Sequence, residues 1–421
     1  MRRRGPFAAL LASCAVSVAG TSMSAIAVPW LVLSTSGSAA KTGVVAFAQM
    51  GMYVLVQMLS GPVVDRVGLR RSFVIGNSLA AVAVGAIPVA LAAGVLGFPV
   101  LIALVAVAGA VRGAADTANG ALVPMTAQAG GVDLERASGL YSSARGVAQL
   151  IGAPLAGVMV AAFGPASAIS VDAVTFAVAA AAVAIWIRLP EPKAAETEGE
   201  SELSAVKRYC RELAQGARFV RGDRLLLGLI SMIALSNLLD QGFQEVMLPV
   251  WARREVGSAT ALGVIGAAGA IAALSGNFIA TWIGTRLSRR TIYSWGYLIS
   301  GAPRLVVIAL TTALAPVVGV VLVTEMFGGS LNPAIGATQY ERIPEHLRAR
   351  VLGLTRASAW VGIPFGALLG GYLVQASGLR EAVFAFAGAY LLTTLAPFVF
   401  PVWRQMRRPS PEPEREEARS M

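Results

Sequence analysis

The sequence predicts an all-α membrane protein with twelve transmembrane helices in two pseudo-symmetric six-helix halves. Three observations lead to this prediction. Of the 421 residues, 56% are hydrophobic and only 14% are charged, whereas about 25% of residues are charged in an ordinary soluble domain. Apolar runs of roughly twenty residues, long enough to cross a bilayer, recur along the whole chain. The basic residues, finally, gather in alternate loops.

Apolar runs bounded by charged or Gly/Pro-rich breaks predict the individual spans. The first begins like a secretory signal, with Arg2–Arg4 ahead of apolar residues, but it continues to Leu33. Because that length exceeds the apolar region of a signal peptide, we expect an uncleaved first span. In order, the predicted spans are 7–33, 42–64, 72–95, 98–125, 137–162, 165–188, 225–252, 260–285, 291–312, 316–340, 351–376 and 380–404.

The distribution of basic residues predicts the orientation. With the N-terminus inside, the inner segments hold 26 of the 34 Lys and Arg residues, and the outer segments hold 4. The positive-inside rule then places both termini in the cytoplasm. The chain has 31 arginines and only 3 lysines, a usage that we interpret as the codon bias of a GC-rich bacterium, so we expect the cytoplasmic (inner) membrane of a bacterium. The net charge of +11 is therefore a topology signal and does not indicate nucleic-acid binding.

The longest polar stretch separates the first six spans from the last six. We expect an N-terminal half at 1–188, a cytoplasmic linker at 189–224, a C-terminal half at 225–404 and a disordered tail at 405–421. The second part of the linker has the pattern of an amphipathic helix, which fits either the anionic inner leaflet or a solvated brace between the halves. Glycines that repeat 214 residues apart, such as Gly152 and Gly366, support two related halves.

Segment 61–71, GPVVDRVGLRR, joins the second and third spans. Its first glycine allows a close helix approach, its second permits a turn with positive φ, and its arginines hold the turn in the cytoplasm. The segment resembles the signature loop of the major facilitator superfamily, with Leu69 where a basic residue is usual. The resemblance implies the major facilitator fold and a gating motif at Gly61, Asp65, Arg66, Gly68, Arg70 and Arg71.

Other segments narrow the resemblance. TSGSA at 35–39, RARVLGL at 348–354 and the basic segment before the seventh span are most similar to the macrolide and enterobactin exporter group. GAPLAG at 152–157 partly resembles a pattern of drug/proton antiporters, although its small residues suit plain helix packing equally well. The resemblance implies that the first, fourth, seventh and tenth spans line a substrate cavity, with wall residues Met23, Trp30, Asn119, Met232, Phe243 and Asn332.

Five acids and four arginines lie within predicted spans, and a charge in the hydrocarbon region suggests a function because it is costly. Arg112 and Asp116 are four residues apart on one helix and can pair. Arg145 lies at a similar depth and could join them in a cluster. Arg304 and Glu325 are level on the ninth and tenth spans. For each pair, a purely structural ion pair is an equal alternative.

Asp240 is the leading candidate for proton coupling. It lies midway along the seventh span, and no arginine of the eighth, eleventh or twelfth span is level with it. An unpaired carboxylate in a nonpolar region is driven toward its neutral form and can carry a proton. Glu325 and the Arg112–Asp116 pair are the second candidates. The alternative is that Asp240 binds a cationic substrate or a neighbouring helix. Asp172 is expected to be structural.

The same residues argue against an enzyme. TSGSAAKTG resembles a phosphate-binding loop only superficially, because Ala40 stands where that loop needs glycine. His346 is the only histidine, which excludes the common His-based metal sites. We therefore expect no catalytic residue, metal ligand or cofactor.

The sequence thus predicts a secondary active transporter that couples proton entry to efflux of small amphipathic molecules by alternating access. Its expected partners are a small-molecule substrate, the lipid bilayer and the proton gradient, with no nucleic acid, and the protein is expected to be a monomer. Three alternatives remain open: proton-coupled uptake, movement of a lipid between leaflets, and a non-transporting sensor on the same fold.

Overall fold

The computed structural model describes residues 5–187, 211, 214–283 and 287–406, and over these residues the chain is helical without strands. The first group of helices comprises α1 (Gly5–Ser36), α2 (Ala39–Leu59), α3 (Gly61–Val67), α4 (Leu69–Ala92), α5 (Phe98–Ala129), α6 (Leu134–Phe163) and α7 (Pro165–Trp186). The predicted all-α architecture is confirmed. Most of the predicted linker and residues 407–421 of the predicted tail lie outside the described residues.

The second group begins with α9 (Arg224–Gly242). It continues through the π-helical segment η2 (Phe243–Met247), α10 (Leu248–Trp251), the π-helical segment η3 (Ala252–Val256), α11 (Thr260–Ile283), α12 (Arg289–Ser300), α13 (Ala302–Leu310), α14 (Leu314–Gly329), α15 (Leu331–Arg342), α16 (Glu345–Val361), α17 (Ile363–Ser377), α18 (Leu379–Val399) and the 3₁₀ turn η4 (Pro401–Gln405).

Eleven helical segments in the described part of the chain are long and apolar enough to cross a membrane. The predicted ninth span, 291–312, is the exception, because Gly301 divides it into α12 and α13. The ring of Tyr390 occupies the place that a Cβ atom at position 301 would take, so only glycine fits there. The exact number of twelve spans therefore stays a prediction.

The predicted second span is also divided. The sequence predicts that it continues to residue 64, but α2 ends at Leu59 and α3 begins at Gly61. Pro62 occupies the first turn of α3, where its missing N–H needs no helical partner. The short helix α3 therefore has its own direction at one end of the molecule, beside the turn that carries the predicted gating motif.

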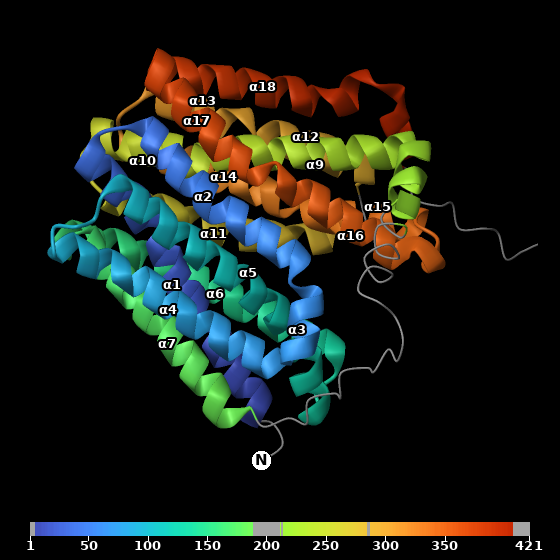
Figure 1. Cartoon of the computed structure of the whole chain (residues 1–421). Coiled ribbons are helices and arrows are strands. Elements are labelled where there is room, and N and C mark those ends of the chain that lie inside the picture. Colours follow the sequence, from blue (N-terminus) through green and yellow to red (C-terminus); the bar gives the residue numbers. More distant parts are fainter. Residues whose placement is uncertain (1–4, 188–210, 212–213, 284–286, 407–421) are drawn as a thin grey trace, which may run out of the picture.

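The helices form two groups that meet along two pairs of helices (Figure 1). Within the first group, α1 packs against α6 and α7, and α2 packs against α5. Within the second, α11 packs against α14, and α9 packs against α17. The groups meet where α2 contacts α17 and where α6 contacts α11. Both contacts require glycine, because the helix backbones come too close for a Cβ atom. Gly43 of α2 lies against Gly371 of α17, and Gly157 of α6 lies against Gly263 of α11.

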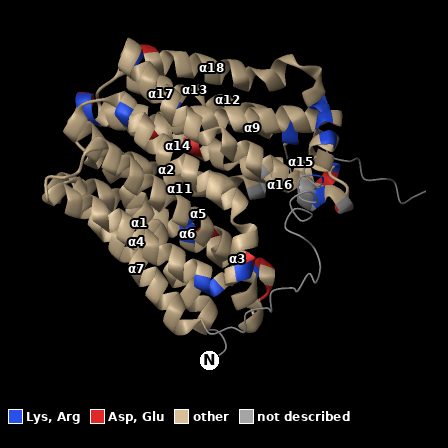
Figure 2. Ribbon diagram, viewed as in Figure 1, with Lys and Arg blue, Asp and Glu red and all other residues tan. Residues whose placement is uncertain are grey.

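The two ends of the molecule differ in charge and in contact between the groups. Arginines gather at the end that carries α3, α15 and α16, which we call the basic end (Figure 2). The two hydrogen bonds that join the groups, within the described residues, both lie at the opposite end. There Ser38 Oγ donates to Gln375 Oε1 over 3.1 Å, and Arg254 Nη2 donates to the Gly37 carbonyl over 3.1 Å. The groups are therefore joined at the end opposite the basic one.

Candidate functional site

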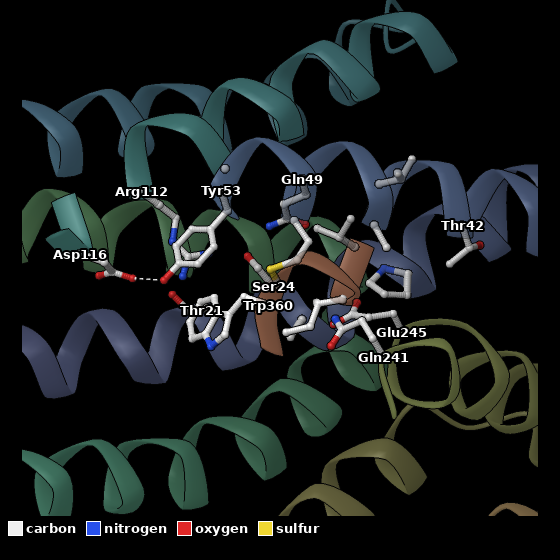
Figure 3. Close-up of a pocket in the computed structure, with 18 of the residues that line it drawn as sticks. Thr21, Ser24, Thr42, Gln49, Tyr53, Arg112, Asp116, Gln241, Glu245 and Trp360 are labelled. Atoms are coloured by element: carbon white, nitrogen blue, oxygen red, sulfur yellow. Dashed lines mark hydrogen bonds between the residues drawn. The ribbon is translucent and has the colours of Figure 1, made fainter. Parts of the chain in front are cut away.

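A cavity of about 250 Å³, the central cavity, lies between the two groups (Figure 3). Helices α1, α2, α5 and α6 line it from the first group, and α9, η2, α16 and α17 line it from the second. Its polar and aromatic wall residues are Thr21, Ser24, Thr42, Gln49, Tyr53, Arg112, Asp116, Arg145, Gln241, Glu245 and Trp360. Apolar residues such as Val28 and Met50 complete the wall. The cavity thus offers charges of both signs within apolar and aromatic surroundings.

The arrangement around Asp116 differs from the predicted one. Asp116 Oδ2 accepts a hydrogen bond of 2.8 Å from the Tyr53 hydroxyl on α2 (Figure 3). The Arg112 guanidinium lies over the rings of Tyr53 and Phe176, at 5.8 Å and 5.4 Å from their centroids. Among the described residues, Arg112 and Asp116 form no direct ion pair in this conformation, and their role in proton coupling stays a prediction. Tyr53 takes the place of Arg112 because it reaches Asp116 from the neighbouring helix.

Arg145 lines the same cavity as Arg112 and Asp116. Its similar depth along the predicted span had suggested this proximity. It donates to the Tyr141 hydroxyl over 3.3 Å, and that hydroxyl accepts a second hydrogen bond from Asn119 Nδ2 over 2.9 Å. Both arginines of the cavity therefore contact tyrosines. Their charges remain available to the carboxylates of the site or to a bound molecule.

Glu245 links the central cavity to a second one. It accepts a hydrogen bond of 3.1 Å from Gln241 Nε2, one turn earlier, and has no ion-pair partner among the described residues. Its neighbouring cavity, the side cavity of about 380 Å³, is lined by Glu245 and also by Phe243, Arg304 and Glu325. The sequence alone marks Glu245 only as a like-charged neighbour of Asp240.

Arg304 connects Glu325, which lines the side cavity with it, to Asp240, which does not line that cavity. Its Nη1 donates to Glu325 Oε1 over 2.6 Å, which confirms the predicted proximity of these residues. Its Nη2 pairs with Asp240 Oδ1, and the Tyr390 hydroxyl lies 3.5 Å from the other oxygen of Asp240. The expectation that Asp240 has no arginine partner is therefore wrong. The ninth span does supply one, because α13 starts anew after the break at Gly301 and brings Arg304 to α9.

This three-residue cluster combines a buried cation with partly accessible acids. The side chain of Arg304 is 7% exposed, whereas those of Asp240 and Glu325 are 31% and 25% exposed. The guanidinium also lies over the rings of Phe243 and Tyr390, at 5.6 Å and 5.8 Å from their centroids. One arginine and two carboxylates leave this cluster with a formal charge of −1, and Glu245 adds a further carboxylate to the wall of the side cavity.

The other residues predicted for the substrate cavity lie in several places. Phe243 lines the side cavity, as noted above. Met23 and Trp30 are buried on the face of α1 that turns away from the central cavity, because the lining residues of α1 are Thr21, Ser24, Ala25, Val28 and Pro29. Asn119 is buried beside Tyr141, Met232 lines a separate groove near the basic end, and Asn332 is exposed on α15. These five residues do not line the central or the side cavity.

The turn that carries the gating motif lies at the basic end. Gly68 has a φ of 94°, so the expected positive φ is confirmed. Arg70 Nη2 donates to the Ala184 carbonyl near the end of α7 over 2.5 Å, which ties the turn to its own group. Asp65 and Arg71 are exposed, and Asp65 has no hydrogen-bond or ion-pair partner among the described residues.

Asp172 lines neither cavity, although its hydrogen-bond partner Ser24 is a wall residue of the central one. It is 1% exposed and accepts a hydrogen bond from the Ser24 hydroxyl, and the Thr175 hydroxyl donates to its backbone carbonyl over 2.7 Å. Ser24 is on α1 and Asp172 on α7, so this contact joins two tightly packed helices. Its burial within the first group fits the expected structural role.

A comparison with known families decides the family of the chain. The model of the Major Facilitator Superfamily matches residues 10–240 and 230–420. The chain belongs to this superfamily. The family inferred from the turn at 61–71 is therefore confirmed, and the protein is a multi-pass membrane transporter and not an enzyme.

Relatives with curated names are multidrug efflux pumps. This transporter is 29% identical over 417 residues to the multidrug efflux pump Tap of Mycobacterium tuberculosis, over 96% of this chain and 95% of that protein. It is 26% identical over 408 residues to the multidrug efflux pump Tap of Mycolicibacterium fortuitum, over 96% of this chain and 98% of that protein.

Solved structures share the fold of this transporter. The nucleoside transporter NupG matches with a TM-score of 0.69 and 12% identity, over 94% of this chain and 99% of that one. A bacterial homolog of the human lysosomal transporter Spinster, in an inward-facing and unoccupied conformation, matches with a TM-score of 0.71 and 13% identity, over 97% of this chain and 99% of that one.

Sequence reasoning missed several residues of the central cavity. Tyr53, Gln49 and Trp360 carry no intramembrane charge, so nothing distinguished them from other residues of apolar helices. Gln49 and Tyr53 are four residues apart and share a face of α2. Polar residues at helical spacing inside an apolar run were the signal that could have identified them.

Proposed function

We propose that this transporter couples proton entry to the efflux of small amphipathic molecules. The central cavity supports this function best, because aromatic and apolar residues surround two carboxylates and two arginines there. Such a lining suits a molecule with a hydrophobic body and a polar or charged group. The names of the curated relatives, both multidrug efflux pumps, favour export over uptake.

The transport cycle would alternate access to the central cavity between the two sides of the membrane. Both hydrogen bonds between the groups, among the described residues, lie opposite the basic end, so the described conformation corresponds to a state that is closed on that side. By the positive-inside rule the basic end faces the cytoplasm. A substrate would enter the cavity from the cytoplasm, and the groups would then separate at the other end.

Proton coupling is assigned to the cluster of Asp240, Arg304 and Glu325. One guanidinium cannot neutralise two carboxylates, and the remaining charge of −1 in a nonpolar region favours the uptake of one proton. Binding of that proton weakens the attraction between Arg304 and one acid. Because the three residues lie on α9, α13 and α14, a proton there would change the contacts of three helices at once.

The experiment uses everted membrane vesicles with an acidic interior and a panel of fluorescent amphipathic compounds. The wild type should accumulate some of them, and a protonophore should stop the accumulation. Asp240→Asn should abolish accumulation but preserve binding of the same compounds to the purified protein. Glu255→Gln, which changes an exposed acid outside both cavities, is the matched control. Wild-type pH dependence in the Asp240→Asn variant would refute the coupling assignment.

A lack of proton-linked accumulation of any compound by the wild type would refute efflux itself. Uptake of the same compounds into right-side-out vesicles under an inward proton gradient would favour the uptake alternative. A protein that binds the compounds and moves none of them would be a sensor. These outcomes separate efflux from two of the alternatives that the sequence left open, namely uptake and a sensor.

A further inference from the structure

A groove of about 670 Å³ lies between α9 and α18 at the basic end, outside both cavities described above. On α9 it is lined by Arg224, Gly228, Ser231, Met232 and Leu235, which form one stripe of the helix. Its other wall consists of Thr393 and Ala396 on α18, together with residues of the chain from Phe400 to Gln405. Leu235 and Phe400 are 43% and 56% exposed, so the groove opens sideways, toward the surroundings of the bundle.

The groove exists because α18 ends early and the chain turns back. After Val399 the helix gives way to η4, and Trp403 folds under the groove to stack on Tyr293, with ring centroids 5.2 Å apart. Gly228 provides room for this ring, since a Cβ atom there would lie 3.2 Å from Trp403 Cζ2. A larger residue at position 228 would press on the indole ring that forms the floor.

The charge at the mouth of the groove is positive and unbalanced. Arg224 lines the groove, and Arg404 lies on η4 between Trp403 and Gln405, which both line it. Both arginines are exposed, and neither has a hydrogen-bond or ion-pair partner within the described residues. The adjacent acid, Asp223, is already engaged: its Oδ2 accepts from Arg342 Nε over 2.9 Å, and its Oδ1 caps the N-terminus of α9. Within the described part of the chain, Asp223 already has these partners, so it does not neutralise Arg224 or Arg404.

The dimensions of the groove match one leaflet of a bilayer. From Arg224 to Leu235 the α9 wall extends eleven residues, or about 16 Å at 1.5 Å per residue. Half of the hydrocarbon core of a bilayer is about 15 Å thick. A groove of this length brings its positive end to the level of the lipid headgroups when its apolar end reaches the middle of the membrane.

We propose that this groove binds an anionic phospholipid, with the phosphate at Arg224 and Arg404 and an acyl chain along Met232, Leu235 and Ala396. Charge complementarity selects the headgroup, and the apolar stripe accepts the chain. Because the site lies outside the central and side cavities, it does not depend on the direction of transport or on its coupling ion.

A smaller cavity elsewhere at the basic end provides the comparison. It measures about 230 Å³ and is lined by Arg136 together with Asp133 and apolar residues such as Leu11. Its arginine also lies at the basic end, but a carboxylate accompanies it, so the cavity is formally neutral. Arg136→Gln therefore removes the same charge from the protein without touching the α9–α18 groove.

The test compares phospholipid retention by native mass spectrometry on the full-length protein, with phosphatidylglycerol and phosphatidylcholine of identical acyl chains. The wild type should retain phosphatidylglycerol preferentially. Arg224→Gln and Arg404→Gln should each weaken this retention about fivefold, as expected for one arginine near an anionic headgroup. Arg136→Gln should match the wild type. Ser231→Phe, which fills the groove but keeps both arginines, should lose the bound lipid.

Three results would overturn the proposal: equal retention of the two lipids by the wild type, unchanged retention in both arginine variants, or unchanged retention after Ser231→Phe. Displacement of the phospholipid by a transported compound would assign the groove to substrate instead and would also overturn it. Two single arginine variants and one filling variant are used so that poor insertion of any one of them leaves the others decisive.

Discussion

Tyr53 and Trp360 stack across the boundary between the two helix groups, with ring centroids 5.9 Å apart and ring planes inclined by 22°. Tyr53 is on α2 and Trp360 on α16, and both line the central cavity. The Tyr53 hydroxyl also donates to Asp116. This aromatic pair therefore forms part of the cavity wall and connects the two helix groups. Through the Tyr53 hydroxyl it also contacts an intramembrane acid.

Trp360→Ala should weaken the binding of aromatic substrates to the purified protein. An aromatic pair contributes about 0.5–1.5 kcal/mol beyond its buried area, so we expect a loss of affinity of roughly two- to tenfold. The control is Trp295→Ala, because Trp295 packs on Phe398 and does not line the central cavity. Equal losses in both variants, measured by fluorescence titration, would show that the effect is not specific to the site.

Arg304→Gln should destabilise the protein by about 3–5 kcal/mol, because it removes the buried cation and leaves two partly buried carboxylates without a partner. The triple variant Arg304→Gln, Asp240→Asn and Glu325→Gln should recover much of this stability, since it removes the unbalanced charges as well. Thermal unfolding of the purified proteins measures both effects. A triple variant no more stable than Arg304→Gln alone would contradict the ion-pair network.

The position of Arg304 also shows how far the sequence could predict the site. Its proximity to Glu325 followed from counting residues along two spans, because each residue of a straight helix adds the same rise. Its pairing with Asp240 did not follow, because residue counting assumes one straight helix over 291–312, whereas the chain breaks at Gly301 and α13 starts anew after it. The membrane fold was predictable from composition and from the turn at 61–71, which depend on no such detail.

Asp116 illustrates a second limit. Spacing along one helix correctly placed Arg112 within reach, but the choice between Arg112 and Tyr53 depends on which helix packs beside α5. That neighbour is α2, and no periodicity in a single sequence identifies it. Local rules therefore predicted which residues carry charge, whereas the partners of those charges depended on tertiary packing.

Gly371→Ala should shift the balance between the two states of the transporter. A Cβ atom there would lie 2.7 Å from the Ala39 carbonyl and 3.0 Å from the Gly43 Cα, so α2 and α17 must move apart. We expect more frequent opening at the end opposite the basic one, measured as faster labelling of a cysteine at Thr42 in the central cavity. Gly388→Ala, with open space around it, is the control. Identical labelling of the two variants would contradict this role.

Asp65→Asn should impair transport while leaving the amount and the stability of the protein unchanged. Asp65 is exposed and, among the described residues, has no partner in this conformation, so its loss costs little here, within about 0.5 kcal/mol. Its carboxylate can form charge-assisted hydrogen bonds when the groups close at the basic end. Transport rates in everted vesicles, normalised to protein content, measure the effect. Wild-type transport rates in this variant would contradict a gating role and leave Asp65 with a role in membrane topology only.

The predicted orientation can be tested with single cysteines in a background without Cys14 and Cys210. A cysteine at Ser38 should react with an impermeant thiol reagent added to intact cells, and one at Leu287 should react only after the cells are opened. Ser38 is partly exposed and Leu287 is exposed, and the two positions lie at opposite ends of the bundle. Labelling of position 287 from outside would reverse the topology.

The π-helical segment η2 affects how this span tolerates the deletion of a residue. Leu248 N–H bonds to the Phe243 carbonyl five residues earlier, so the segment contains one residue more than an α-helical turn. Deleting Gln244 would restore ordinary α-helical bonding and leave Trp251 Nε1 facing the Thr311 carbonyl, its present partner at 3.0 Å. The same deletion within α11 would rotate every later residue of that helix by about 100°. Loss of one residue from η2 should therefore disturb the packing of the residues that follow it less than the same loss within α11.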